Sequence, residues 1–254
     1  MGAVKADLDH LSVSSIRRYL ECPKRWAAER FDGKKSAWGV ALIKGRAVDE
    51  LATANWRQKA ASGQDWDVGY AHEFTEDAFR RVVDEAGGRS EVDWGQESFA
   101  RGLDSSLRLA GGHMREHARL ITPAGVQVRF SHKLPDGRDL IGYIDAIDQN
   151  GDVIDVKTGA RRMNQGDADR DLQATAYAYG LARPIKFRWF RVIDQARTVT
   201  EIVESDRGQN AVDWFEDLAS SVSVLIDAGV YPAHPGWQCA NCPIAAQCVG
   251  SLKA

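Results

Sequence analysis

Residues 142–158, GYIDAIDQNGDVIDVKT, decide the fold. Two short apolar segments flank an Asn-Gly pair, which is typical of the tight turn between two antiparallel strands. Asp145 falls on the first predicted strand, while Asp155 and Lys157 fall on the second, two residues apart. Side chains two residues apart on a strand share one face of the sheet. The stretch therefore predicts a hairpin that gathers two carboxylates and an amine.

These side chains are either solvated charges on an ordinary hairpin or the centre of a metal site. Carboxylates that become buried are costly unless they are paired or bound to metal. Their oxygens suit Mg²⁺ or Mn²⁺, and the backbone carbonyl of Val156 could add another ligand. Lys157 could supply a cation that stabilises charge on a phosphate. Asp49, on a preceding predicted helix, could complete the metal's coordination or lie on a solvated flank.

The flanking segments predict a mixed α and β fold. Ser12 or Ser14 can cap a first helix that ends at Cys22, and Pro23 can open a second. Apolar spacing predicts further helices over about 37–60, 71–86, 94–121, 169–182 and 209–228, and strands over 126–134, 139–148, 185–193 and 197–204. We expect Gly111-Gly112 to break or bend the helix over 94–121, and residues 158–171 to form a polar loop.

The order of these elements predicts an α/β (α+β) fold in which helices flank a mixed central sheet. We expect one domain over 1–254, with an N-terminal helical lobe at 11–122 and the catalytic sheet core at 123–205. A final helix and a cysteine-rich tail would occupy 206–254.

Composition excludes few functions. The 254 residues carry a net charge of −3, and no apolar run approaches the roughly 18 residues that a membrane span needs. The first residues lack the layout of a signal peptide, so we expect a cytoplasmic protein. Lys and Arg exceed Asp and Glu in residues 1–60. That surplus suits a local phosphate-binding groove, although ordinary variation between solvated faces would also explain it.

The cysteines are strongly clustered. They are Cys22, Cys239, Cys242 and Cys248. Three within ten residues suggest ligands of a metal or a cluster rather than disulfides in a cytosolic protein. His113 and His117, four residues apart, could also bind zinc, but no Glu stands in the metalloprotease position between them, so a packed or surface pair is the simpler interpretation.

Taken together, these motifs resemble a known family. Asp145, then Asp155-Val156-Lys157, then Gln173 and Tyr177 on the next predicted helix are similar to the PD-(D/E)XK nuclease superfamily. Within it the likeness is to RecB-type exonuclease domains, including AddB and the CRISPR-associated RecB-like exonucleases. The SVSSIRRYLECPKRW opening and the C-x2-C-x5-C tail also resemble theirs. The similarity covers about Leu11 to Cys248.

The resemblance implies a restriction-endonuclease-like core and a role for each matching residue. Asp145 and Asp155 would bind the metal, Lys157 would be the catalytic lysine, and Gln173 and Tyr177 would line the site. The four cysteines would hold a 4Fe–4S cluster that ties the N-terminal helix to the C-terminal tail, although Cys₄ sites also bind zinc.

One position departs from the family pattern. Many members carry a histidine in a G-x-x-H motif of the N-terminal helix, whereas here Gly45 is followed by Arg46, Ala47 and Val48, and then by Asp49. An aspartate is a competent ligand for a hard metal, so this change could alter metal preference without removing the chemistry.

The predicted function is a metal-dependent DNA exonuclease that contains an iron–sulfur cluster and acts on single strands or DNA ends. Its groove would be lined by the basic N-terminal segment, with Lys24 and Arg25, and by the 158–171 loop, with Arg161 and Arg162. The tryptophans Trp26, Trp38 and Trp56 could stack on bases or pack in the core. The alternatives are a catalytically idle DNA-binding or recombination-accessory module and a zinc-stabilised interaction domain.

Overall fold

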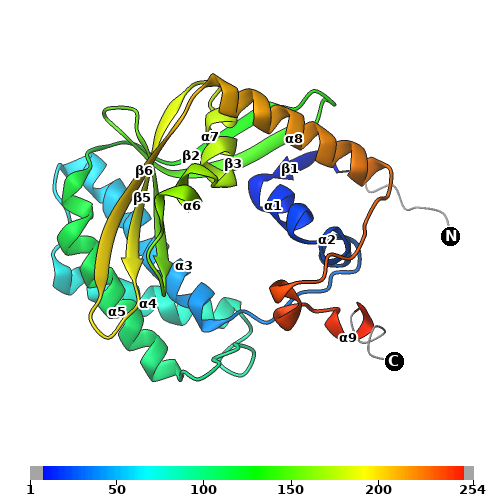
Figure 1. Ribbon diagram of the computed structural model, residues 1–254. Coiled ribbons are helices and arrows are strands. Elements are labelled where there is room, and N and C mark those ends of the chain that lie inside the picture. Colours follow the sequence, from blue (N-terminus) through cyan, green and yellow to red (C-terminus); the bar gives the residue numbers. More distant parts are fainter. Residues whose placement is uncertain (1–7, 249–254) are drawn as a thin grey trace.

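Strand β3 (Asp139–Asp148) organises the fold, because three other strands pair with it. The computed structural model describes residues 8–248, and the strand order is β1-β3-β4-β5-β6, with β2 also paired to β3. Residues 1–7, which include most of the stretch used to judge targeting signals, and residues 249–254 lie outside the described residues. The central mixed sheet with helices on both faces confirms the predicted fold class (Figure 1).

The remaining elements follow the predicted order closely. The other strands are β1 (His10–Ser12), β2 (Pro123–Lys133), β4 (Val153–Gly159), β5 (Ile185–Ile193) and β6 (Val199–Arg207). The helices are α1 (Val13–Glu21), α2 (Pro23–Phe31), α3 (Val40–Ser62), α4 (Val68–Glu85), α5 (Phe99–Glu116), α6 (Gln165–Asp169), α7 (Leu172–Gly180), α8 (Gln209–Asp227) and α9 (Ala245–Cys248), with 3₁₀ turns η1 (Ala118–Leu120) and η2 (Trp237–Asn241). None of these helices is both long and apolar enough to cross a membrane.

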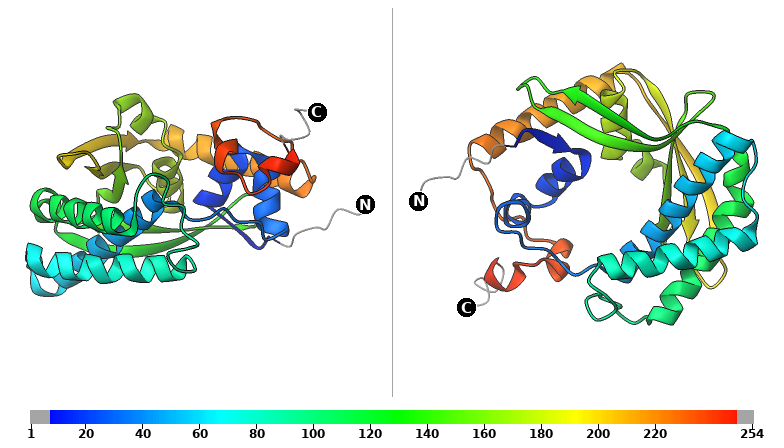
Figure 2. Two further views of the ribbon diagram at one scale, coloured as in Figure 1. Left: turned by 90° about the horizontal axis from the view of Figure 1, so that it is seen from below. Right: turned by 180° about the vertical axis from the view of Figure 1, so that it is seen from behind.

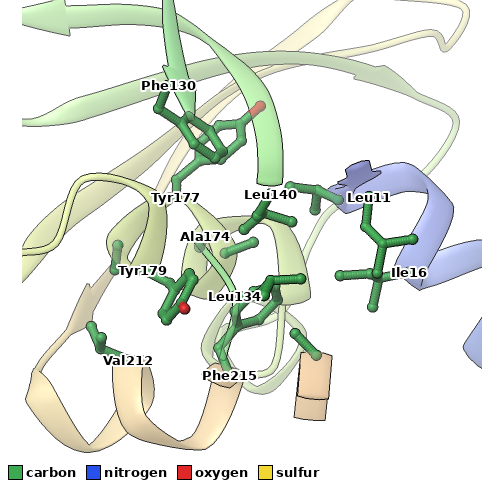
Figure 3. Close-up of a cluster of buried hydrophobic side chains, with 14 of the residues drawn as sticks. Leu11, Ile16, Phe130, Leu134, Leu140, Ala174, Tyr177, Tyr179, Val212 and Phe215 are labelled. Carbon is green, nitrogen blue, oxygen red and sulfur yellow. The ribbon is translucent and has the colours of Figure 1, made fainter. Parts of the chain in front are cut away.

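The two faces of the sheet carry different helices. On one face, α3 and α5 pack Val48, Trp56 and Leu109 against Ile154 and Phe190, and α4 lies outside them. On the other face, α1, α7 and α8 build a larger core around the β2–β3 pair (Figure 3). The helices of the first face, α3 and α5, lie between β1 and β2 in the chain. On the second face, α7 follows β4 and α8 follows β6, and they pack beside the early helix α1. The functional residues lie where these two layers meet at β3 and β4.

One edge of β3 is interrupted. Residues 139–141 pair with parallel strand β1, and Ala146 and Ile147 pair with antiparallel strand β4. Between them, residues 142–145 have no strand partner on this edge among the described residues, while β2 pairs along the opposite edge. The short strand β1, which the sequence patterns did not predict, and the early divergence of β4 together leave a gap in the sheet.

Two local expectations differ from the structure. Helix α5 is not broken at Gly111-Gly112 but continues through both glycines. The missing side chain at Gly112 permits close packing, since a Cβ there would lie 3.0 Å from the Thr198 side chain and 3.3 Å from that of Val192. The segment 158–171 is not wholly a loop, since Asn164 caps α6 by accepting a hydrogen bond from the backbone N–H of Asp167.

The C-terminal tail returns to the N-terminal helices. After α8 the chain runs beside α1 and α2, as both views in Figure 2 show. The Tyr19 hydroxyl donates to the Val230 carbonyl at 2.6 Å, and the Lys24 N–H donates to the Pro232 carbonyl at 3.2 Å. These contacts hold residues 230–232 of the tail against α1 and α2.

Candidate active site

The predicted hairpin residues meet at the gap in β3. Asp145 lies at the end of the unpaired edge, and Asp155 and Lys157 lie on β4 where it has left β3. The Val156 N–H, which has no partner in β3, donates to Asp145 Oδ2 at 3.2 Å. Because the N–H and C=O of one residue point to the same edge of a strand, the Val156 carbonyl also faces this gap. The side chain of Asp145 thus bridges the space that strand pairing leaves open.

Asp155 is the most deeply buried charge in this cluster. Its side chain is 0% exposed, and its Oδ1 accepts hydrogen bonds from Lys157 Nζ at 2.9 Å and from Gln173 Nε2 at 2.7 Å. Its Oδ2 is buried without any hydrogen-bond partner among the described residues. A buried carboxylate oxygen with no partner carries a large desolvation cost. That unsatisfied oxygen is therefore suited to a cation.

Lys157 is held in its charged form. Burial lowers the pKa of Lys157, but Asp155, Asp145 and Asp49 outweigh that effect and raise it above the ordinary value for lysine. The ammonium group pairs with Asp155, and the side chain remains partly exposed. At neutral pH Lys157 is a cation that can still reach a ligand; it is not a base.

Asp49 joins the cluster from α3. That helix passes close to the end of β4, since a Cβ on Gly45 would lie 3.1 Å from Thr158 Oγ1. Asp49 follows one turn later, and burial together with Asp155 raises its pKa to about 6, although Lys157 opposes the shift. Burial, Asp155 and Asp49 also raise the pKa of Asp145 well above its usual range. Three carboxylates thus share one poorly solvated region.

Gln173 and Tyr177 lie on one face of α7, as their spacing predicts. The Gln173 amide donates to Asp155 and, at 2.8 Å, to the Tyr177 hydroxyl. That hydroxyl donates in turn to the Tyr143 carbonyl, in the unpaired edge of β3, at 2.7 Å. Burial and the nearby Asp155 and Asp145 raise the pKa of Tyr177, so it stays protonated. The pair connects α7 to both β3 and β4.

Gln127 is a site residue that the sequence patterns missed. Its Nε2 lies 3.5 Å from Asp145 Oδ1 and 3.2 Å from Thr53 Oγ1 on α3. Its backbone φ is +51°, unusual for a residue other than glycine. In the sequence Gln127 is one polar residue among several that alternate along a strand, so no local signal distinguishes it.

The chemistry of the donors fits a hard divalent cation, since Asp49, Asp145, Asp155 and the Val156 carbonyl offer only oxygens. Within residues 8–248, however, no three acidic, histidine or cysteine side chains lie as close as the ligands of a single ion. The Val156 amide instead donates a hydrogen bond to Asp145 Oδ2, and Lys157 and Gln173 donate to Asp155 Oδ1. The fit therefore rests on the unsatisfied Asp155 oxygen and on the donor set.

The four cysteines line one pocket, although Cys22 is more than two hundred residues from the others. Cys22 is buried at the junction of α1 and α2, and the rest lie in the tail. The His234 N–H donates to Cys22 Sγ at 3.5 Å, and the Gly236 N–H donates to Cys239 Sγ at 3.4 Å. Hydrogen bonds from N–H groups to sulfur are among the features that surround the cysteine ligands of iron–sulfur clusters.

The predicted DNA contacts differ in their surroundings. Arg161, Arg162 and Lys24 are exposed, and Arg162 lies 3.4 Å from Glu201. Arg25 is only 9% exposed; it donates to Glu29 and Ser36 and lines the cysteine pocket. Its guanidinium is therefore engaged inside the protein.

The tryptophans considered for base stacking and the histidine pair at the C-terminal end of α5 pack against other side chains. Trp26 and Trp56 are buried in separate cores, so the base-stacking role considered for them is wrong, while Trp38 lies under the Arg46 guanidinium. His113 and His117 are also buried, with rings in edge contact. Burial lowers the pKa of His113 to about 3 and that of His117 to about 4. Both rings are neutral near pH 7.

Comparisons with known proteins show the family and a similar fold. A sequence profile of the PD-(D/E)XK nuclease superfamily matches residues 10–249. A crystal structure from Eubacterium rectale, of a protein provisionally described as an exonuclease, has a TM-score of 0.60 and 12% identity, covering 92% of this chain and 89% of its own. The structure of SSO0001, also 12% identical and with 92% of each chain covered, has a TM-score of only 0.35. No curated protein matches the chain.

Proposed function

The chain belongs to the PD-(D/E)XK nuclease superfamily, and on that premise we propose that it is a metal-dependent deoxyribonuclease that degrades single-stranded DNA from an end. The observation that carries this proposal is the convergence of Asp145, Asp155 and Lys157 on the gap in β3. A catalytically idle DNA-binding module would not need this arrangement. The exonuclease description of the Eubacterium rectale protein, which has a similar fold, supports the choice of reaction.

The proposed roles follow from the contacts. Asp145, Asp155, Asp49 and the Val156 carbonyl hold Mg²⁺ or Mn²⁺, which supplies positive charge to the phosphate and activates water when bound. Lys157, kept protonated by its acidic neighbours, stabilises negative charge that develops on the phosphate. Gln173 positions Asp155 and Tyr177 through its amide.

Other proposed contacts surround this centre. Lys24, Arg161 and Arg162 contact DNA phosphates at the surface, and the enzyme acts in the cytoplasm. The four cysteines hold a 4Fe–4S cluster; their shared pocket and the two N–H groups directed at sulfur support this assignment. Arg25, buried in the same pocket, stabilises the surroundings of the cysteines rather than contacting DNA.

The test is degradation of end-labelled single-stranded DNA with Mg²⁺ or Mn²⁺. Asp155→Asn and Lys157→Ala are expected to lower the rate at least a hundredfold, because they remove a metal ligand and the cation. Lys186→Ala, which removes an exposed lysine of β5, is the matched control and should retain full activity. Circular dichroism must show that each variant is folded. Full activity in both site variants would contradict the assignment.

A further inference from the structure

A groove adjoins the catalytic cluster along the unpaired edge of β3. Its volume is about 500 Å³, within the range of sites that enclose a small ligand. Gln173 and Tyr177 form the wall shared with the cluster, and the other walls come from β1, from one face of α1 and from residues 141–143. Gln173, which donates a hydrogen bond to Asp155, therefore connects the groove to the catalytic cluster.

Tyr143 presents an aromatic ring at this groove. Its side chain is 53% exposed, whereas most large aromatic side chains of the core are fully buried. Its backbone carbonyl is held by the Tyr177 hydroxyl, so the ring projects from a fixed point of the strand. Two residues along a strand span roughly 7 Å, so the distance between Tyr143 and Asp145 is comparable to the length of one nucleotide.

The facing wall carries positive charge. Arg17 and Arg18, on successive positions of α1, both line the groove. The Arg17 side chain is 40% exposed and contacts Asp171, the residue that caps α7, at 3.3 Å. Arg18 pairs more closely with Glu21 and Glu29. Arg17 is thus the cation better able to turn toward a ligand in the groove.

We propose that this groove binds the nucleotide next to the scissile phosphodiester, with the Tyr143 ring stacked on an unpaired base and Arg17 on the adjoining phosphate. The proposal rests on the proposed nuclease function and extends it to the choice of a single strand. An exposed ring stacks only on a base whose face is free, and bases in the interior of a duplex have both faces covered. Tyr143 therefore favours single-stranded DNA over the interior of a duplex.

Binding without turnover tests this assignment. Fluorescence anisotropy in EDTA compares a labelled oligothymidylate with an oligonucleotide of equal length that has abasic sites in place of its bases. Tyr143→Ala is expected to weaken oligothymidylate binding about 5- to 100-fold, the range for loss of base–aromatic stacking, and to leave abasic binding unchanged. Tyr143→Phe should bind like the unaltered protein, because stacking does not need the hydroxyl.

Tyr70→Ala is the matched control, since that tyrosine is 49% exposed on α4 and does not line the groove. Equal oligothymidylate binding by the unaltered protein and Tyr143→Ala would overturn the proposal. An equal loss on abasic DNA, or no binding by the unaltered protein, would overturn it as well. Because the assay needs no cleavage, Tyr143-dependent binding without nuclease activity would refute only the proposed function. Cleavage without Tyr143-dependent binding would refute only this groove.

Discussion

At the scale of single residues, the buried carboxylate of Asp49 lowers the stability of the folded protein when no metal ion is bound. Burial and the nearby Asp155 raise the pKa of Asp49 to about 6. Between the ordinary aspartate pKa, near 4, and pH 6, Asp49 binds more protons in the folded protein without metal than in the unfolded chain. The contribution of Asp49 to stability therefore falls as pH rises through that window and stays lower above it.

Asp49→Asn should remove this dependence, because the amide does not ionise. In EDTA we expect the variant to match the unaltered protein near pH 4 and to exceed its stability by about 3 kcal/mol above pH 6, from roughly 1.4 kcal/mol per pKa unit. Urea unfolding across pH 4–8 measures the difference. Asp84→Asn, on the exposed face of α4, is the control. Parallel pH profiles for Asp49→Asn and the unaltered protein would disprove the account.

Gln127 shows strain at a functional position. Its φ of +51° places the amide between Asp145 and Thr53, and such conformations cost of order 1 kcal/mol in residues other than glycine. We infer that the strain is retained because the amide orients Asp145. The residue acts through Asp145 and is therefore a positioning residue.

Gln127→Gly should separate the two effects. Glycine adopts positive φ without strain, so thermal stability in EDTA should stay equal or rise, while Mn²⁺ binding measured by calorimetry should weaken several-fold. Ala182→Gly is the matched control, since Ala182 also has φ +51° but lies beyond α7, away from the carboxylates; it should leave Mn²⁺ binding unchanged. Unaltered Mn²⁺ affinity in Gln127→Gly would rule out positioning.

At the scale of elements, the Phe130 ring fixes the distance between α7 and the sheet. Phe130 on β2 lies between Gly142 on β3 and Gly180 at the end of α7, and a Cβ on either glycine would collide with the ring. The ring also contacts Tyr177 edge-on, 5.7 Å between centroids (Figure 3). Close packing through two glycines thus fixes the helix that carries Gln173.

Gly180→Ala is expected to destabilise the protein by about 1–3 kcal/mol through overpacking. Phe130→Leu alone leaves a cavity, but its smaller side chain makes room for the new methyl group. The double variant should therefore be less destabilised than the sum of the single changes, as urea unfolding in a double-mutant cycle would show. Simple additivity would mean that the ring and the helix do not constrain each other.

At the scale of the whole molecule, the cysteine pocket joins the two ends of the described chain. Cys22 lies between α1 and α2, while Cys239, Cys242 and Cys248 lie in the tail. A cofactor bound by all four would close a loop of more than two hundred residues. Closing so long a loop stabilises the folded state by restricting the unfolded chain. It would also hold α1, which lines the groove, against the sheet.

Cys239→Ala should therefore lower both iron content and melting temperature. Iron analysis and visible absorbance of protein purified without oxygen report the cluster, and thermal scans report stability. Unaltered protein stripped of its cluster is the control and should melt near the variant. Zinc in place of iron in the unaltered protein, or unchanged iron content in the variant, would contradict the 4Fe–4S assignment.

Much of this architecture follows from local sequence. Strands β3 and β5 begin and end as their alternation predicts, because apolar periodicity and turn residues act over a few neighbours. The i,i+2 and i,i+4 spacings likewise bring Lys157 to Asp155 and Gln173 to Tyr177. These pairs needed only the geometry of a strand and a helix.

The rest depends on contacts between distant segments. Strand β1 and the divergence of β4 leave one edge of β3 open, where the Tyr143 groove forms. The packing of α3 on the sheet and the pairing of β2 with β3 bring Asp49 and Gln127 to the carboxylates. The continuity of α5 through Gly112 likewise depends on the side chains of β5 and β6 that pack against this glycine. Such features were decided by tertiary structure, because their free energy comes from packing and burial between residues far apart in the chain, which local periodicity does not encode.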